Sequence, residues 1–191
     1  EESPKEKPLL DAFLDNPYLC QECQLSTHLR HIKMEGVKVT FLYQYEDKIR
    51  ETLLRYKEGR DKYLARCILW DYRYYLKLLS KRWKFVCVPS RNESRGKRGF
   101  DHLPLLLDCL GIKSTDALIN TAENDQTQSK NRTSILKHIS IKSTEEIEDC
   151  NVILLNDIST SGNTITACIR ALKPHANKLK VIVIASANIK H

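Results

Sequence analysis

Residues 151–164 read Asn-Val-Ile-Leu-Leu-Asn-Asp-Ile-Ser-Thr-Ser-Gly-Asn-Thr. The uncharged run 152–155 is shorter than a typical helix and is bounded by polar residues, which predicts a strand buried on both faces. After the polar residues, apolar side chains recur at the spacing of an amphipathic helix, at Ile165, Cys168, Ile169 and Leu172. We therefore expect a strand, an acid, a hydroxyl-rich turn and a helix, in that order.

The turn in this stretch has the composition of a phosphate-binding site. Backbone N–H groups and the positive end of the helix dipole attract an anion, and Gly162 has no β-carbon to obstruct it. Asp157 just upstream can accept hydrogen bonds from vicinal hydroxyls, so the expected ligand is a ribose 5-phosphate. The alternative is an ordinary strand-to-helix turn capped by Ser or Thr. The expected ligand-binding residues are Ser159, Thr160, Ser161, Gly162, Asn163 and Thr164.

Composition limits the class of protein. The chain has 191 residues, 41% of them hydrophobic, which suits one domain with an appendage. A net charge of +7 favours anionic partners or reflects a Lys-rich solvated surface. No apolar run approaches the roughly 18 residues of a membrane span, and no signal peptide is seen. The absence of a membrane span and of a signal peptide predicts a soluble cytoplasmic protein. The odd number of cysteines, seven, predicts reduced thiols. The chain opens without Met, so we expect residues upstream of Glu1.

Residues 1–40 are expected to form a charged leader followed by a metal knuckle. Cys20 and Cys23 have the Cys-x-x-Cys spacing of a zinc site, and His28 and His31 follow closely. Four such ligands can hold a tetrahedral Zn²⁺. The alternative is a vestigial or truncated half-site.

Residues 41–82 are expected to contain a strand at 41–45, a helix from Glu46 to Tyr56 and a second helix over 62–80. The second helix carries an aromatic stripe that either packs in a core or interface or stacks on bases beside Arg66 and Arg73. The stripe consists of Trp70, Tyr72, Tyr74 and Tyr75.

Residues 83–191 are expected to form the core. A strand at 85–88 ends at Pro89 and precedes a loop rich in cations, which would hold pyrophosphate or is simply a solvated basic loop. The expected pyrophosphate-binding residues are Ser90, Arg91, Arg95 and Arg98. A helix over 101–110, a long polar loop over 121–144 and a strand at 181–184 follow. Alternating strands and helices predict an α/β fold with a parallel sheet covered on both faces.

The stretch 151–164 resembles the phosphoribosyl-pyrophosphate (PRPP) motif of type I phosphoribosyltransferases, which has four apolar residues, two acids and a Thr/Ser-rich turn with one glycine. Asp157 matches the second acid, and Asn156 stands where the first acid is usual. Further motifs in the same order are similar to the ComF family, which is associated with DNA uptake in competent bacteria. These motifs are Cys20-x-x-Cys23, Tyr43-x-Tyr45, Tyr56-Lys57-x-Gly59, Val88-Pro89 and Arg98-Gly99-Phe100.

The resemblance implies a type I phosphoribosyltransferase-like parallel sheet flanked by helices, beneath a small N-terminal hood that contains the cysteines. It implies PRPP or another ribose 5-phosphate compound as ligand, Mg²⁺ accompanying PRPP, a zinc module, and a role beside single-stranded DNA and competence proteins. Asp157 and Asn156 would be the catalytic pair, but Asn156 lacks a carboxylate. The alternative is a catalytically inactive module on the same fold that associates with nucleotides or single-stranded DNA.

Overall fold

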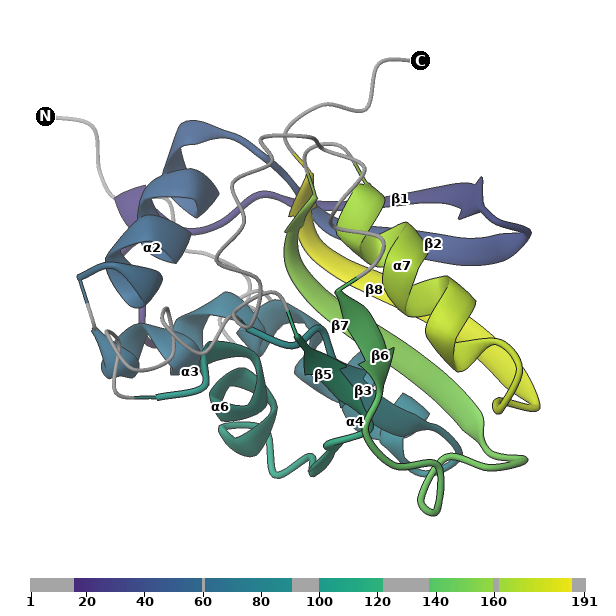
Figure 1. Cartoon of the computed structure of the whole chain (residues 1–191). Coiled ribbons are helices and arrows are strands. Elements are labelled where there is room, and N and C mark those ends of the chain that lie inside the picture. Colours follow the sequence, from purple (N-terminus) through teal and green to yellow (C-terminus); the bar gives the residue numbers. More distant parts are fainter. Residues whose placement is uncertain (1–15, 60, 91–99, 122–137, 160–161, 187–191) are drawn as a thin grey trace, which may run out of the picture.

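The computed structural model describes residues 16–59, 61–90, 100–121, 138–159 and 162–186. A six-stranded sheet in the order β1-β2-β8-β7-β3-β4 forms its centre (Figure 1). Every neighbouring pair is parallel except β1 and β2. The strands span Thr27–Met34 (β1), Val37–Gln44 (β2), Lys84–Cys87 (β3), Ser114–Thr115 (β4), Asn151–Ser159 (β7) and Lys178–Ser186 (β8). The predicted α/β class is confirmed.

Strand β7 lies inside the sheet because its apolar residues are covered on both faces. All four residues of the run 152–155 are fully buried, as the sequence predicted. The strand continues to Ser159, so Asn156 and Asp157 lie within it and not beyond its end, which corrects the predicted boundary. The pairing with β8 extends through this polar part and keeps it in the sheet.

The N-terminal part contributes an antiparallel hairpin to the same sheet. Glu35 and Gly36 connect β1 and β2 with positive φ angles of 51° and 76°, as a tight two-residue hairpin turn requires. Arg170 of helix α7 (Asn163–Leu172) and Lys173, which follows it, hydrogen-bond Glu35 and fix the turn to that helix. Strand β2 therefore begins before the strand predicted at 41–45 and crosses the expected boundary between residues 40 and 41.

Three of the predicted helices form close to their expected bounds: α2 (Asp47–Lys57), α6 (His102–Asp108) and α7. The single helix predicted over 62–80 is wrong. The segment consists of η2 (Lys62–Leu64), α3 (Ala65–Ile68), η3 (Trp70–Tyr72) and α4 (Arg73–Ser80).

Side chains from other parts of the chain explain where that helix is interrupted. Asn16 donates a hydrogen bond to the Cys67 carbonyl at 2.7 Å, and Tyr43 donates one to the Ile68 carbonyl at 2.9 Å. These carbonyls would otherwise accept from the next helical turn, so tertiary donors replace the helical ones. Leu69 accordingly leaves helical geometry, with φ −106° and ψ 6°.

The aromatic stripe divides between core and surface. Tyr72 is buried and donates a hydrogen bond to the Leu42 carbonyl at 2.5 Å, whereas Tyr74 is 71% exposed. The Arg73 guanidinium stacks on Trp70 and on Tyr74, at 4.2 and 4.3 Å from the ring centroids. Core packing is thus confirmed for Tyr72, whereas Tyr74 lies on the surface.

Two short strands, β5 (Leu118–Asn120) and β6 (Ile139–Ile141), form a separate antiparallel pair. They lie in front of the large sheet in Figure 1, on the side where α7 crosses β7 and β8, and α4 lies behind the strands. Strand β6 falls within the polar segment predicted as a loop over 121–144, and residues 122–137 lie outside the described residues. In the described part of the chain, no helix is both long enough and apolar enough to cross a bilayer.

Candidate ligand-binding site

The connections of the parallel strands define where a ligand can bind. From β3 the chain passes through α6 to β4 on one side, and from β7 it passes through α7 to β8 on the other. Because the two connections leave in opposite directions, a crevice opens between the carboxyl ends of β3 and β7, where open α/β sheets bind ligands. Helix α2 follows the carboxyl end of β2 at the same edge of the sheet.

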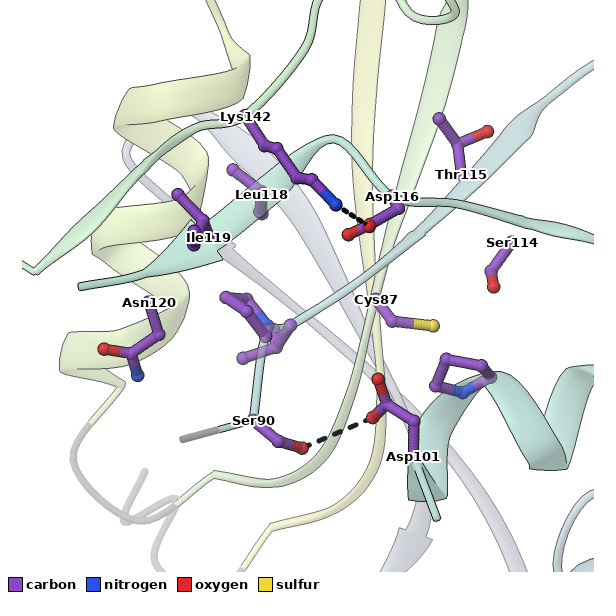
Figure 2. A pocket seen from close by; sticks show the side chains of 13 residues that line it. Cys87, Ser90, Asp101, Ser114, Thr115, Asp116, Leu118, Ile119, Asn120 and Lys142 are labelled. Atoms are coloured by element: carbon purple, nitrogen blue, oxygen red, sulfur yellow. Dashed lines mark hydrogen bonds and ion pairs between the residues drawn. The ribbon is translucent and has the colours of Figure 1, made fainter. Parts of the chain in front are cut away.

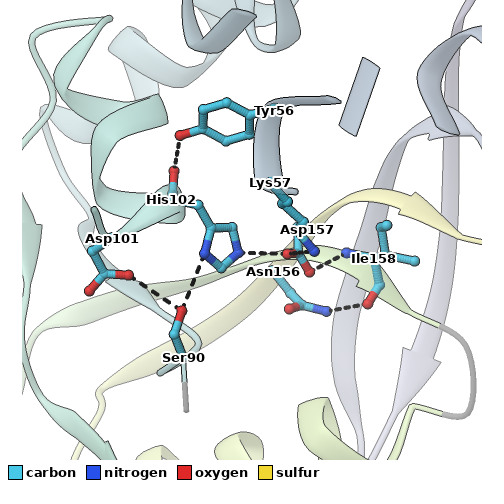
Figure 3. Close-up of polar contacts among 8 residues, drawn as sticks. All are labelled: Tyr56, Lys57, Ser90, Asp101, His102, Asn156, Asp157 and Ile158. Carbon is cyan, nitrogen blue, oxygen red and sulfur yellow. Dashed lines mark hydrogen bonds and ion pairs between the residues drawn. The ribbon is translucent and has the colours of Figure 1, made fainter. Parts of the chain in front are cut away.

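Asp157 is the centre of a buried polar network at this crevice (Figure 3). Its Oδ2 atom pairs with the Lys57 ammonium from α2 and lies 2.6 Å from His102 Nε2 at the start of α6. Its Oδ1 atom accepts the backbone N–H of Ile158 at 2.5 Å. A carboxylate can only accept, so His102 donates from Nε2. Two segments distant in sequence thus supply donors to one carboxylate.

The surroundings of Asp157 keep it ionised. Burial alone would raise the pKa of its carboxyl, but the hydrogen bond from His102 and the positive charge of Lys57 outweigh burial and hold the pKa well below its usual range. The site therefore presents a fixed negative charge paired with a fixed positive one.

A second set of contacts fixes the imidazole of His102. Its Nδ1 atom lies 3.2 Å from the Ser90 hydroxyl, which follows β3, and Ser90 also donates to Asp101 at 3.5 Å (Figure 3). Tyr56, fully buried on α2, donates to the His102 carbonyl at 2.5 Å. Consecutive residues of α2, Tyr56 and Lys57, therefore join the two ends of the network.

A cavity of about 220 Å³ opens onto this network. Its lining brings together residues from α2, the segment after β3, α6, β7 and the start of α7. The lining residues are Lys57, Val88, Pro89, Ser90, His102, Leu103, Asn156, Asp157, Ile158 and Thr164. The cavity thus joins Asn156 and Asp157 to Thr164, a predicted phosphate-binding residue.

The predicted phosphate-binding turn begins and ends in described residues. Ser159 is buried at the end of β7, and Asn163 and Thr164 form the first turn of α7. Gly162 caps that helix with φ 75°, a left-handed conformation that favours glycine, and its carbonyl accepts the N–H of Thr166 at 2.9 Å. Thr160 and Ser161 lie outside the described residues.

Of the predicted pyrophosphate-binding residues, the structure describes Ser90 alone, and Arg91, Arg95 and Arg98 lie outside the described part. Asn156, predicted as a catalytic partner of Asp157, donates from its side chain to the Ile158 carbonyl at 3.0 Å. Its amide therefore bonds the backbone at the end of β7.

The predicted zinc ligands are not gathered at one point. Cys20 precedes the short η1 turn (Gln21–Cys23) and Cys23 ends it, and a hydrogen bond with Cys23 lowers the pKa of the Cys20 thiol. His28 and His31 lie on β1, where the ring of His31 is 3.0 Å from the Thr40 hydroxyl. In the described ranges, no group of three or more His, Cys, Asp or Glu side chains could hold a metal ion. Zinc binding stays a prediction that rests on the cysteine pair.

A second cavity, of about 260 Å³, is also lined by Ser90 (Figure 2). Its polar lining is largely paired within the protein, since Lys142 forms an ion pair with Asp116 and Ser90 hydrogen-bonds Asp101. The lining also includes Cys87, and burial raises the pKa of that thiol. This cavity shares Ser90 with the first one but not Asp157.

Lys57 and His102 are site residues that sequence patterns alone do not predict. Lys57 belongs to the motif Tyr56-Lys57-x-Gly59, and His102 lies in the helix predicted over 101–110. The sequence signal for both residues is their position. Lys57 is the last residue of the helix that follows β2, and His102 is the first residue of the next helix after β3.

The phosphoribosyl transferase domain family matches residues 67–190, and the chain belongs to this family. A crystal structure of a hypoxanthine phosphoribosyltransferase from Staphylococcus aureus aligns over 64% of this chain and 68% of that chain, with 16% identity and a TM-score of 0.38.

Two curated relatives share the name Competence protein ComFC. The protein from Bacillus subtilis is 28% identical over 81% of this chain, and that from Streptococcus pneumoniae is 29% identical over 76%. The chain spans 65% and 64% of the length of these two relatives. The resemblance to the ComF family is confirmed.

Proposed function

We propose that the chain binds the ribose 5-phosphate part of PRPP or of a related compound, and that it acts in DNA uptake during natural competence. The phosphate would lie at the start of α7 and a ribose hydroxyl at Asp157. The name of the curated relatives supports the link to competence.

The observation that carries this proposal is the single cavity that takes in both Asp157 and Thr164. A buried ionised carboxylate is a strong acceptor for a sugar hydroxyl. A helix N-terminus that begins at a left-handed glycine is suited to a phosphate. The two groups lie at the topological switch point, which supports a small ligand over an extended one.

Phosphoribosyl transfer would require more than binding. In that reaction the bond from the anomeric carbon to pyrophosphate breaks and a bond to a nitrogen nucleophile forms, while the cations of residues 91–98 stabilise the departing pyrophosphate. No side chain needs to act covalently. The residues suited to this role are Ser90, Arg91, Arg95 and Arg98.

A specific observation favours the second candidate, a binding module without transferase activity. Asn156 replaces one acid and bonds the backbone, and Asp157 is already paired with Lys57. Such a module could associate with nucleotides or single-stranded DNA on the same fold. Exchange of labelled pyrophosphate into PRPP, measured with candidate nucleobases and their nucleotides present, separates the candidates. Only a transferase re-forms PRPP from the labelled pyrophosphate and a nucleotide, with release of the base.

Calorimetric titration tests the binding claim. Ribose 5-phosphate and PRPP should bind, whereas ribose alone should bind far more weakly because it lacks the phosphate. Asp157→Asn should weaken ribose 5-phosphate by about 10-fold or more, since a hydrogen bond to a charged acceptor contributes about 1.5–3 kcal/mol. Asp108→Asn, on an exposed carboxylate of α6, is the matched control and should bind like the original protein. Equal affinity for ribose and ribose 5-phosphate would contradict the proposal.

A further inference from the structure

The acceptor positions of Asp157 are nearly all in use. A carboxylate offers about four lone-pair positions. Within the described residues, His102 and Lys57 bond Oδ2, and the Ile158 N–H bonds Oδ1. One position on Oδ1 remains for a ligand, which is enough for one ribose hydroxyl.

The charge at the site is also balanced within the protein. Asn156 brings no charge, and the single negative charge of Asp157 is matched by Lys57, whose side chain is only 17% exposed. A divalent cation approaching Asp157 would meet an ammonium already bound to the same carboxylate, and like charges at such short range repel. The described residues offer no cluster of three or more metal-ligating side chains. They do not fit a Mg²⁺ ion held by the protein.

Lys57 can bond a ligand as well as Asp157. An ammonium group has three donors, and within the described residues Lys57 uses one of them on Asp157. The side chain lines the cavity together with Asp157 and Thr164, so its remaining donors can reach a sugar hydroxyl or an anionic oxygen. The Tyr56 hydrogen bond to His102 fixes the end of α2 that carries Lys57.

We infer that Lys57 takes the place of a divalent cation at Asp157, so that this site binds a phosphorylated ribose without a metal ion. The inference rests on the proposed function, adds a ligand-binding residue to it, and removes the need for a metal ion at Asp157. Mg²⁺ that arrives with PRPP is then held by the phosphates of PRPP itself and not by Asp157.

The experiment is a calorimetric titration with ribose 5-phosphate in two buffers, one with EDTA and one with excess Mg²⁺. The original protein should bind with affinities that agree within about twofold, because no metal ion takes part. Lys57→Gln should bind about 10- to 100-fold more weakly in EDTA, the range expected for loss of one charged hydrogen bond. Mg²⁺ should restore part of that loss by supplying the missing positive charge.

Two further variants make the result specific. Lys57→Arg keeps the charge and should stay independent of Mg²⁺. Lys48→Gln, on the exposed side of the same helix, removes a charge remote from the site and should bind like the original protein.

The outcomes separate this inference from the proposed function. Binding by the original protein that requires Mg²⁺ would overturn the role of Lys57 while leaving the proposed function intact. An unchanged affinity of Lys57→Gln for ribose 5-phosphate in EDTA would also overturn the role of Lys57. Absence of binding in both buffers would overturn the proposed function, and this inference with it.

Discussion

At the scale of single residues, Gly162 is the position where backbone geometry and the proposed phosphate site coincide. Its φ of 75° is unfavourable for any residue with a β-carbon, and an added β-carbon would lie 2.6 Å from Met34 Cε. Gly162→Ala should therefore lower the free energy of unfolding by about 1–2 kcal/mol and also weaken ribose 5-phosphate. Chemical denaturation and calorimetry measure the two effects.

Gly111→Ala is the matched control for this prediction. Gly111 has a similar φ of 70°, and a β-carbon there would meet nothing within 4 Å. The Gly111→Ala variant should lose about as much stability as Gly162→Ala does, without losing affinity for ribose 5-phosphate. Equal loss of affinity in both variants would show that the effect of Gly162→Ala is only a loss of stability.

The depressed pKa of Asp157 predicts a pH dependence of stability. A carboxyl whose pKa is lower in the folded state stabilises the fold above its unfolded pKa of about 3.9, and this stabilisation is lost as the pH falls through the folded pKa. At pH 7, Asp157→Asn should cost about 3 kcal/mol, because it leaves a buried ammonium without its counter-ion.

Below about pH 4 the difference between the original protein and Asp157→Asn should narrow, since the Asp157 carboxyl takes up a proton in the unfolded state and so stabilises that state. Urea unfolding between pH 7 and pH 3 provides the measurement. A difference that stays constant over this range would mean that ionisation of Asp157 does not stabilise the fold.

At the scale of elements, the hydrogen bond that joins α2 to α6 positions the site. Tyr56 is fully buried, and burial raises the pKa of its hydroxyl, which donates to the His102 carbonyl. Tyr56→Phe should lower the free energy of unfolding by about 1 kcal/mol and weaken ribose 5-phosphate severalfold by displacing Lys57 and His102. Tyr63→Phe, at a side chain that is 85% exposed, should change neither quantity.

The η1 turn carries the remaining prediction, which concerns zinc. Cys20 and Cys23 are the only cysteines at ligand spacing, so protein with its native N-terminus should contain up to one Zn²⁺ per chain, and Cys23→Ser should remove it. Elemental analysis of purified protein counts the metal. Zinc retained by Cys23→Ser would exclude the pair as ligands, and retention by His28→Ala would show that this histidine is not needed.

Which elements the sequence could predict depends on how strongly each is patterned. Strands β7 and β8 and helices α2 and α7 have continuous or periodic apolar residues, so their pattern is local. Strand β1 is a polar edge strand with mostly exposed side chains, and nothing in its pattern distinguishes it from a loop. The breaks after α3 arise from donors on Asn16 and Tyr43, which no local pattern encodes.

At the scale of the whole molecule, local sequence patterns likewise predict only those parts of the site that are close together in sequence. Asp157, Gly162 and Thr164 are neighbours in sequence, and their spacing alone predicted them. His102 lies 55 residues from Asp157, and Lys57 lies 100 residues from it (157 − 57). The order of the strands brings them together, because β2, β3 and β7 end at one edge of the sheet.

The most direct test of the proposed function is a crystal structure of the protein with ribose 5-phosphate. The account predicts the phosphate at the N-terminus of α7, within hydrogen-bond distance of Thr164, and a ribose hydroxyl on Oδ1 of Asp157 with Lys57 still paired to Oδ2. A sugar phosphate bound elsewhere, such as in the cavity beside Asp116 and Lys142, or a ribose that does not contact Asp157, would contradict the account.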